Sequence, residues 1–269
     1  SAPGALDCIV EPSATVDLGA PAPGVLAYIP RDRADFIEAG EVVAELESDV
    51  ERATLKLAEA RANLTTTVEL RRANAAFGER QEARHRELVA RKLVPRQDYE
   101  RFETEAKIAQ LQAREANDDR RLAYLEFKRA EAALARRVIR SPIAGVVVDR
   151  FKSEGEYVED QPVLRVANID TLHVEILAPV TLLGRVQVGM QARVKFEPAQ
   201  LGERIATVTR VDAVADAASG TFGVRLELDN PDRKLPAGLR CVAQFDAITA
   251  AAIAGTEASE ADTPTLAGP

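Results

Sequence analysis

The sequence has no tryptophan, one methionine, two histidines and two cysteines among 269 residues, and these shortages restrict its chemistry. Histidine, cysteine and methionine side chains are the usual ligands of transition metals, and Met190 stands alone. Aromatic residues make up only 4% of the chain, so a single large core is not indicated. We therefore expect no metal site, and several small folding units rather than one.

The sequence also lacks a long apolar run and an excess of positive charge. It contains no stretch of about 18 apolar residues, so we expect no membrane-spanning helix. The formal net charge is −8, which argues against a nucleic-acid partner because phosphate binding needs clustered positive charge. Arginines do gather over residues 71–101, but Glu and Asp are interspersed, as is typical of a solvated helix face.

Motifs for catalysis are missing as well. The two histidines, His85 and His173, stand in no catalytic pattern. The sequence contains no Gly-x-Ser-x-Gly elbow, phosphate-binding glycine loop or cluster with metal-ligand spacing. The neighbouring carboxylates Asp118 and Asp119 fall in a long helical stretch, where we expect them to be solvated. The sequence therefore predicts that the protein is not an enzyme.

The two cysteines, Cys8 and Cys241, stand far apart in the sequence. They allow two interpretations, a disulfide formed in an oxidising compartment or two buried thiols in strands. Asp7 precedes Cys8 at a position where lipid-attachment signals have a small residue. We therefore expect Cys8 to carry no lipid.

A short β-type segment occurs twice, before and after a long helical stretch. The first copy contains Gly24-Val25 and Phe36-Ile37, and the second contains Gly145-Val146 and Tyr157-Val158, 121 positions later. Each half exposes an apolar strand face that can be buried only against the other half. The chain must therefore return to its starting place, and the segment between the halves projects outward.

Residues 48–137 have the composition of two long helices separated at Pro95. Ala, Leu, Glu and Arg dominate residues 50–92 and 97–137, and both stretches lack proline. We expect an antiparallel hairpin with arms of about 42 residues, each about 60–65 Å long.

Both arms carry the heptad seam of a coiled coil. In the second arm the seam is apolar at nine of ten positions, which are Phe102, Ala106, Ala109, Ala113, Ala116, Arg120, Ala123, Phe127, Ala130 and Leu134. In the first arm the expected seam is weaker, and it includes Val50, Ala53, Leu57, Ala60 and Leu64, then Phe77, Arg84 and Leu88.

Residues 171–247 alternate apolar and polar side chains, which is typical of β-strands. Five or six short strands with turns between them predict a small closed barrel. We expect a brief helical stretch over residues 180–186 to cover one end. Ahead of the first half-module, residues 6–10 predict a short strand that ends at Pro12 and Ser13.

This order of parts resembles the periplasmic adaptor proteins, or membrane fusion proteins of the HlyD-like family, of Gram-negative tripartite efflux systems. The resemblance rests on Ile139–Val147, Glu154–Val158, Leu164–Val174, Asp229–Pro231 and Leu235–Leu239. It implies an elongated, multi-domain α+β protein with a split lipoyl-like β-sandwich, an antiparallel α-helical coiled-coil hairpin and a small β-barrel. The expected domains are a lipoyl-like domain (14–47 plus 138–171), the hairpin (48–137), the barrel (6–12 plus 172–247) and a disordered or rudimentary membrane-proximal tail (248–269).

The resemblance also implies a function. Such adaptors link an inner-membrane transporter, here expected to be of the resistance-nodulation-division (RND) type, to a TolC-type outer-membrane channel. They assemble as homo-oligomeric rings, commonly hexamers, that form a conduit for export. We therefore expect a periplasmic protein associated with the inner membrane. The alternatives are an adaptor of a type I secretion or ABC-type system, and a metal-efflux adaptor that binds its cargo.

The family's hairpin tip carries Arg, three residues, Leu, six residues and Ser. Arg84 and Leu88 match, and Pro95 stands where Ser is usual. Proline is favoured in the first turn of a helix, so Pro95 can begin the second arm, followed by Arg96 and Gln97. These five residues are the expected channel-docking site.

A third possibility is a carrier domain of a multienzyme complex. Carriers present a modifiable lysine at the turn that joins their two halves. Here Glu47-Ser48-Asp49 leads directly into helix, and no lysine lies there. We therefore expect no lipoyl or other cofactor.

Overall fold

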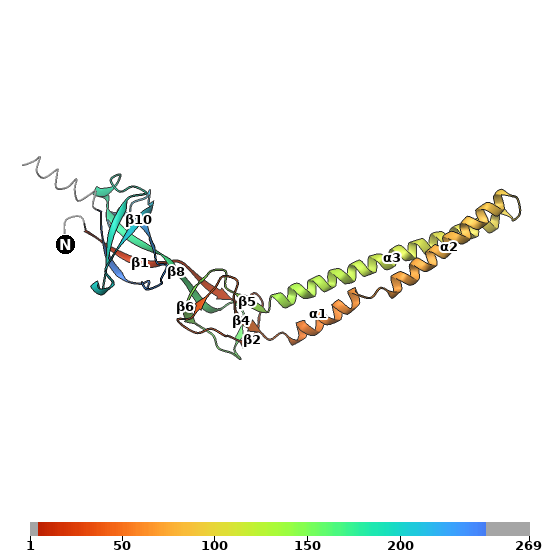
Figure 1. The fold of residues 1–269 in the computed structure, drawn as a ribbon, viewed down its shortest axis with the longest axis horizontal. Coiled ribbons are helices and arrows are strands. Elements are labelled where there is room, and N and C mark those ends of the chain that lie inside the picture. The colour runs from red at the N-terminus through yellow and green to blue at the C-terminus, as the bar shows by residue number, and fades with distance from the viewer. Residues whose placement is uncertain (1–4, 246–269) are drawn as a thin grey trace, which may run out of the picture.

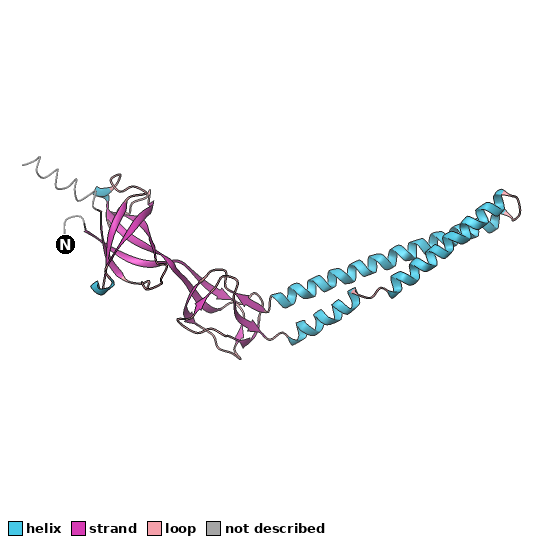
Figure 2. Cartoon of the chain, in the orientation of Figure 1, coloured by secondary structure: helices cyan, strands magenta, loops and turns pink. Residues whose placement is uncertain are grey.

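The computed structural model describes residues 5–245, which form three parts in a row (Figure 1). A β-barrel lies at one end, a β-sandwich follows, and a long pair of helical arms projects from the sandwich (Figure 2). The predicted mixture of helices and sheets, with a sandwich and a barrel, is confirmed. The expected tail, residues 248–269, lies outside the described residues.

The sandwich is built from both halves of the repeat. Its short strands are β2 (Gly24–Tyr28), β3 (Phe36–Ile37), β4 (Val42–Leu46), β5 (Val138–Arg140), β6 (Gly145–Arg150) and β7 (Tyr157–Val158). Strand β2 pairs with β7 so that Gly24 lies opposite Val158, and β6 pairs with β3 so that Gly145 lies opposite Ile37. Each half therefore pairs its first strand with the second strand of the other, and the 121-residue offset relates the two pairs.

The core of the sandwich repeats the same symmetry. Three buried pairs are equivalent under the offset, namely Leu26 with Val147, Ile37 with Val158, and Val43 with Leu164. Since neither half contains this cluster alone, the halves fold only together. The helical segment between them is consequently forced to leave and return at one place.

Two long strands, β1 (Ala5–Gly19) and β8 (Pro162–Pro179), pair with each other and pass through both β-units. The prediction that Pro12 and Ser13 end the first strand is therefore wrong. The strand continues, and its register shifts between Pro12 and Ala14. A bulge is one of the few places where a sheet tolerates proline, because the ladder hydrogen bond is already lost there.

The barrel adds β9 (Gln191–Phe196), β10 (Glu203–Val211), β11 (Thr221–Asp229) and β12 (Arg240–Gln244). The strand order β1-β12-β9-β10-β11-β8 closes because β1 also pairs with β8. The helical stretch expected over residues 180–186 is only a single turn of 3-10 helix, Val180–Leu182. Gly184 has φ of +79°, a left-handed conformation that a continuing helix cannot include. A second short turn is Ala199–Leu201.

The first arm is two helices, α1 (Asp49–Ala62) and α2 (Thr66–Ala90), whereas the second arm is the single helix α3 (Arg96–Ala135). One continuous first arm was expected, so that prediction holds only in part. Both α1 and α2 pack on α3. Among residues 5–245, no helix combines the length and hydrophobicity that crossing a bilayer requires.

The expected seam of α3 does face the other arm. Ala106, Ala113, Ala116 and Ala130 are buried there, and Arg120 is the exposed exception. The expected seam of the first arm is wrong, because Val50, Leu57 and Leu64 are 76%, 56% and 64% exposed. The residues of α1 and α2 that are buried instead are Ala58, Ala62, Val68 and Ala75.

The interruption at residues 63–65 explains this difference. The inward face of α1 repeats through Leu55, Ala58 and Ala62, and an unbroken helix would continue it through Thr65, Glu69 and Arg72. The interruption rotates the chain so that Val68, Ala75 and Gly78 face α3 instead. Apolar contact along the whole arm therefore depends on the break.

Candidate functional site: the hairpin tip and base

The expected docking residues lie at the far end of the hairpin. Arg84 is exposed and Leu88 half-buried, one turn apart on α2, while Pro95, Arg96 and Gln97 begin α3 and are exposed. Pro95 is the residue before the first helical turn, with an extended backbone, and its carbonyl accepts a hydrogen bond from the Asp98 N–H at 3.2 Å. Pro95 therefore stands immediately before α3 and not in its first turn, and its side chain has no hydroxyl to donate.

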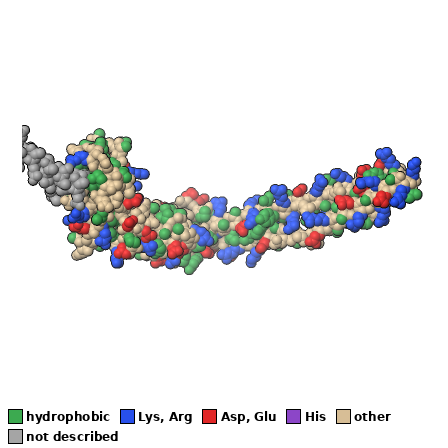
Figure 3. Space-filling model, turned by 45° about the horizontal axis from the view of Figure 1, so that its top comes forward, with side chains coloured by type: hydrophobic (Ala, Val, Ile, Leu, Met, Phe, Trp, Pro, Cys, Tyr) green, Lys and Arg blue, Asp and Glu red, His purple; other side chains and the backbone are tan. Residues whose placement is uncertain are grey.

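The tip is rich in positive charge, as the blue side chains at the end of the hairpin show (Figure 3). Arg86 and Arg96 flank a shallow hollow of about 320 Å³ whose remaining lining residues are Val89, Ala90 and Tyr99. The structure thus brings Arg96 near Arg86, a residue that the family motif does not include. An apolar floor between two guanidinium groups suits a surface that offers carbonyl or carboxylate oxygens beside an apolar side chain.

Below the tip, polar side chains occupy positions of the seam between the arms where the sequence did not predict them. The Tyr99 hydroxyl lies 3.3 Å from a carboxylate oxygen of Glu82 and 3.3 Å from one of Glu103, so one residue of α3 reaches both arms. Glu82 forms an ion pair with Arg86. Hydrogen bonding to Tyr99, and then to Glu82, raises the pKa of Arg86 above its usual value.

His85 belongs to the same region and stacks on Phe102 of α3 with 3.7 Å between the ring centroids. The Nδ1 atom of His85 lies 2.9 Å from the Gln81 carbonyl, one turn back on α2. Once the phase shift at residues 63–65 is known, the heptad spacing places Glu82 and His85 on the inward face. Without it, no signal in the sequence does so.

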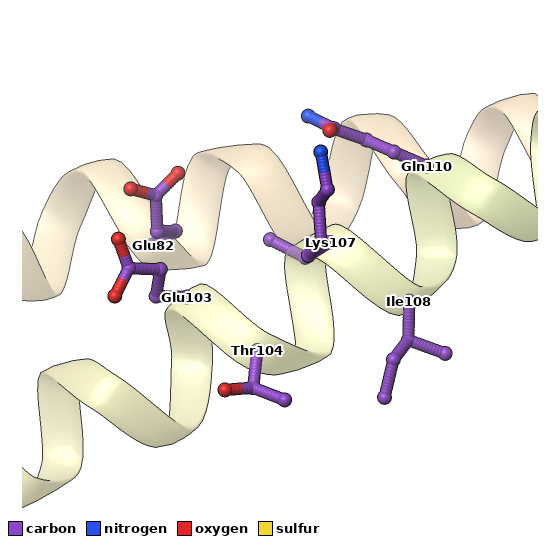
Figure 4. Close-up of a pocket in the computed structure, with 7 residues that line it drawn as sticks. Glu82, Glu103, Thr104, Lys107, Ile108 and Gln110 are labelled. Atoms are coloured by element: carbon purple, nitrogen blue, oxygen red, sulfur yellow. The ribbon is translucent and has the colours of Figure 1, made fainter.

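Two open grooves of 470 and 440 Å³ flank the hairpin where Gly78 meets Ala106. In the first, Glu82 from α2 and Glu103 from α3 lie side by side, and Thr104, Lys107, Ile108 and Gln110 line the remainder (Figure 4). The second is lined by Asn74, Phe77, Gly78, Gln81, Phe102, Glu105 and Ala109.

The base of the hairpin is clamped to the sandwich by two consecutive arginines. Arg137 forms an ion pair with Glu51 of α1 and donates a hydrogen bond to the Pro23 carbonyl at 2.7 Å. Arg136 donates to the Pro21 carbonyl at 3.1 Å. The hydrogen bond from Arg137 lowers the pKa of the Glu51 carboxyl. These contacts tie both arms to one edge of the sandwich.

Cys8 and Cys241 are far from the tip, on the paired strands β1 and β12 of the barrel. They lie opposite each other in the register, and their Sγ atoms are joined in a disulfide of 2.11 Å. Both residues are buried. Of the two interpretations left open by the sequence, the structure has the disulfide.

Within residues 5–245, the structure groups no three His, Cys, Asp or Glu side chains in a way that could hold a metal ion. The features of the hairpin are instead those of a contact surface, with exposed guanidinium groups, half-buried apolar side chains and shallow grooves.

Comparison with known proteins identifies the architecture. Residues 14–168 match the family model of the CzcB-like barrel-sandwich hybrid domain, which covers more than half of the chain. The chain belongs to the CzcB-like membrane fusion proteins. Residues 171–249 of this membrane fusion protein also match the model of the CusB-like β-barrel domain. Membrane fusion proteins are adaptors, and the prediction that the chain is not an enzyme is confirmed.

Solved structures with the same fold come from three different bacteria, and one of the three, Spr0693, is described as a membrane fusion protein. MacA from Actinobacillus actinomycetemcomitans has a TM-score of 0.77 and 19% identity over 90% of this chain and 78% of its own. ZneB from Cupriavidus metallidurans has a TM-score of 0.50 and 27% identity, over 90% of this chain and 96% of its own. Spr0693 from Streptococcus pneumoniae R6 has a TM-score of 0.62 and 14% identity, over 90% of this chain and 98% of its own. None of the curated proteins compared with the sequence matches it.

Proposed function

We propose that this membrane fusion protein is a periplasmic adaptor that links an inner-membrane transporter of the RND type to a TolC-type outer-membrane channel. Copies of the chain would form a homo-oligomeric ring, expected to be a hexamer, and the substrate would pass through it chemically unchanged. The observation that carries the proposal is the split sandwich, which forces a long hairpin outward from a barrel at the opposite end.

Two further observations support this assignment. The barrel model that matches residues 171–249 is named for RND systems, which favours an RND-type transporter. The buried Cys8–Cys241 disulfide favours an oxidising compartment, and the periplasm is one. We also propose that the adaptor is associated with the inner membrane.

In this proposal the tip is the channel-docking surface. Arg84 and Arg96 are exposed guanidinium groups that can each donate several hydrogen bonds to carbonyl oxygens of a facing helix end. Leu88 is half-buried and would fill an apolar notch. Pro95 offers no hydroxyl, so docking here would rely on Arg84, Arg96 and Gln97.

The experiment is crosslinking in cells. A Gln97→Cys variant carrying a photoactivatable thiol reagent should crosslink to a TolC-type channel, and the native cysteines should not react because they are paired. The matched control is Val214→Cys, which is 82% exposed but lies in the barrel. It should give no channel adduct. If Gln97→Cys yields no adduct with any TolC-type protein, the docking role is wrong.

A metal-efflux adaptor that binds its cargo is the second candidate, which the sequence left open. Titration of the purified protein with Zn²⁺ or Cu⁺ would separate the two. Stoichiometric binding at micromolar concentration would favour cargo binding, whereas we expect none.

A further inference from the structure

Each side of the hairpin carries an exposed apolar stripe, and two of the residues in these stripes, Phe77 and Ile108, also line the grooves described above. On the first arm, the outer α1–α2 edge consists of Val50, Leu57, Leu64, Leu70 and Phe77. On the second arm, the outer α3 edge consists of Ile108, Leu111, Leu122 and Leu125. All nine side chains are between 50% and 76% exposed. Large apolar stripes of this kind mark protein interaction surfaces.

The α1 part of the first stripe has the spacing of a coiled-coil seam. Val50, Ala53, Leu57, Ala60 and Leu64 follow one another in steps of three and four, which keeps them on one face of a helix. Ala53 and Ala60 are small enough to let a second helix approach. The sequence predicted this face as the seam of the first arm. The first arm has two such faces, however, and only the inner one contacts α3.

The two edges have their apolar residues at matching heights along the hairpin. Contacts between the arms fix the level of each residue, because Gly78 meets Ala106, Arg71 bonds Gln112, and Glu51 bonds Arg137. In each pair the two residue numbers have nearly the same sum, as expected for residues at the same level of two antiparallel helices. By the same relation, Phe77 lies level with Ile108 and Leu64 lies level with Leu122.

We propose that the outer α1–α2 edge of one copy packs against the outer α3 edge of the next copy. The inference rests on the homo-oligomeric ring of the proposed function and assigns its lateral contact. Rotation about a ring axis that runs along the hairpins keeps every residue at its height. Leu64 of one copy therefore meets Leu122 of its neighbour, and Phe77 meets Ile108. Such a head-to-tail contact uses two different surfaces and can close into a ring.

The size of the stripes fits this occupant. Nine large apolar side chains, each at least half exposed, would be covered by this one contact, with flanking residues in addition. A specific interface needs roughly 1,000 Å² in total. The break at residues 63–65 contributes here as well. Without it, the outward stripe of α1 would continue through Thr67, Arg71 and Asn74, whereas the shifted phase presents Leu70 and Phe77.

Disulfide crosslinking in cells expressing the full chain tests the contact. The double variant Leu64→Cys with Leu122→Cys should give a ladder of crosslinked oligomers that ends at the closed ring. Each single variant should give no crosslinked dimer, because neither edge meets itself. The control pair Leu64→Cys with Ile108→Cys places the thiols about 20 Å apart in height and should give no ladder.

Three results would overturn the proposal: a dimer from Leu64→Cys alone, which requires a symmetric contact; an equal ladder from the control pair; or no ladder from the level pair. The Gln97→Cys channel crosslink, measured in the same cells, separates this inference from the proposed function. A crosslink from Gln97→Cys to the channel without crosslinked oligomers from the level pair would contradict the lateral contact alone. A ladder without a channel adduct supports the contact and sinks the docking role.

Discussion

Gly78 of α2 lies directly against the backbone of Ala106 of α3, so that a Cβ at position 78 would stand 3.1 Å from the Ala106 Cα. The two arms approach closely here because Gly78 has no side chain and Ala106 has only a methyl group to separate them. This contact also fixes the level of one arm against the other, which the lateral packing proposed above requires.

Gly78→Leu should force the arms apart at this crossing. We expect the free energy of unfolding to fall by about 1–3 kcal/mol, because the inserted side chain meets the Ala106 backbone and separating the arms loses packing between them. Chemical denaturation followed by far-UV circular dichroism measures the change. Ala83→Leu, on an exposed position of the same helix, is the control and should change stability by no more than about 0.5 kcal/mol.

A second glycine contact lies inside the sandwich. A Cβ on Gly145 would stand 2.3 Å from the Ala167 carbonyl oxygen, so Gly145→Ala must displace a strand and should cost about 2–3 kcal/mol. At Gly19 the added Cβ meets nothing within 4 Å, so Gly19→Ala should be close to neutral. Thermal unfolding of the two variants beside the parent protein compares them. Equal melting temperatures would contradict the close approach.

Reduction of the Cys8–Cys241 disulfide should destabilise the barrel. The bond joins residues 233 positions apart, and closing so long a loop restricts the unfolded chain strongly. We expect a loss of about 2–5 kcal/mol in guanidinium unfolding after treatment with dithiothreitol. The Cys8→Ala, Cys241→Ala double variant is the control, since dithiothreitol should leave its unfolding curve unchanged.

The ion pair between Glu51 and Arg137 should make the hairpin base sensitive to acid. Because Arg137 lowers the pKa of Glu51 below its usual value of 4.5, the contribution of the pair is fully present above that value. It is lost as the pH falls through the lower pKa of the folded protein. Glu51→Gln should therefore be less stable than the parent at neutral pH, and the difference should vanish in acid.

Unfolding of both proteins at several pH values between about 7 and 3 measures that difference. Glu59→Gln is the matched control, because Glu59 is an exposed residue of α1 with no ion pair among the described residues. A difference for Glu51→Gln that persists unchanged in acid would show that the substitution acts through something other than the charge.

The sequence predicted the sandwich well because its evidence was a repeat. The offset between Gly24 and Gly145 indicates that the two halves bury their apolar faces against each other, whereas the strand pairs themselves are known only from the structure. The seam of α3 was predictable for a similar reason, since alanine occupies most of its positions. The seam of the first arm was not predictable, because α1 has two apolar faces. Choosing between them needs the break at residues 63–65, where Asn63, Leu64 and Thr65 include neither glycine nor proline.

Other features were hidden for different physical reasons. Glu82 and His85 face α3, where Tyr99 bonds Glu82 and Phe102 stacks on His85, and no local pattern reveals neighbours so distant in sequence. The continuation of β1 past Pro12 depends on pairing with β8, which is equally remote. The five docking residues at the tip remain a prediction, which the crosslinking experiment addresses.

The bond between Cys8 and Cys241 makes the intervening chain a covalent loop that includes the whole sandwich and the whole hairpin. A protease cut in the turn between Ala90 and Arg96 would therefore leave one molecule, with two new ends at its far extremity. Under reducing and denaturing conditions the same cut would give two separate polypeptides. The tip is accordingly the place where foreign sequence or new termini could be grafted while the two parts stay covalently attached.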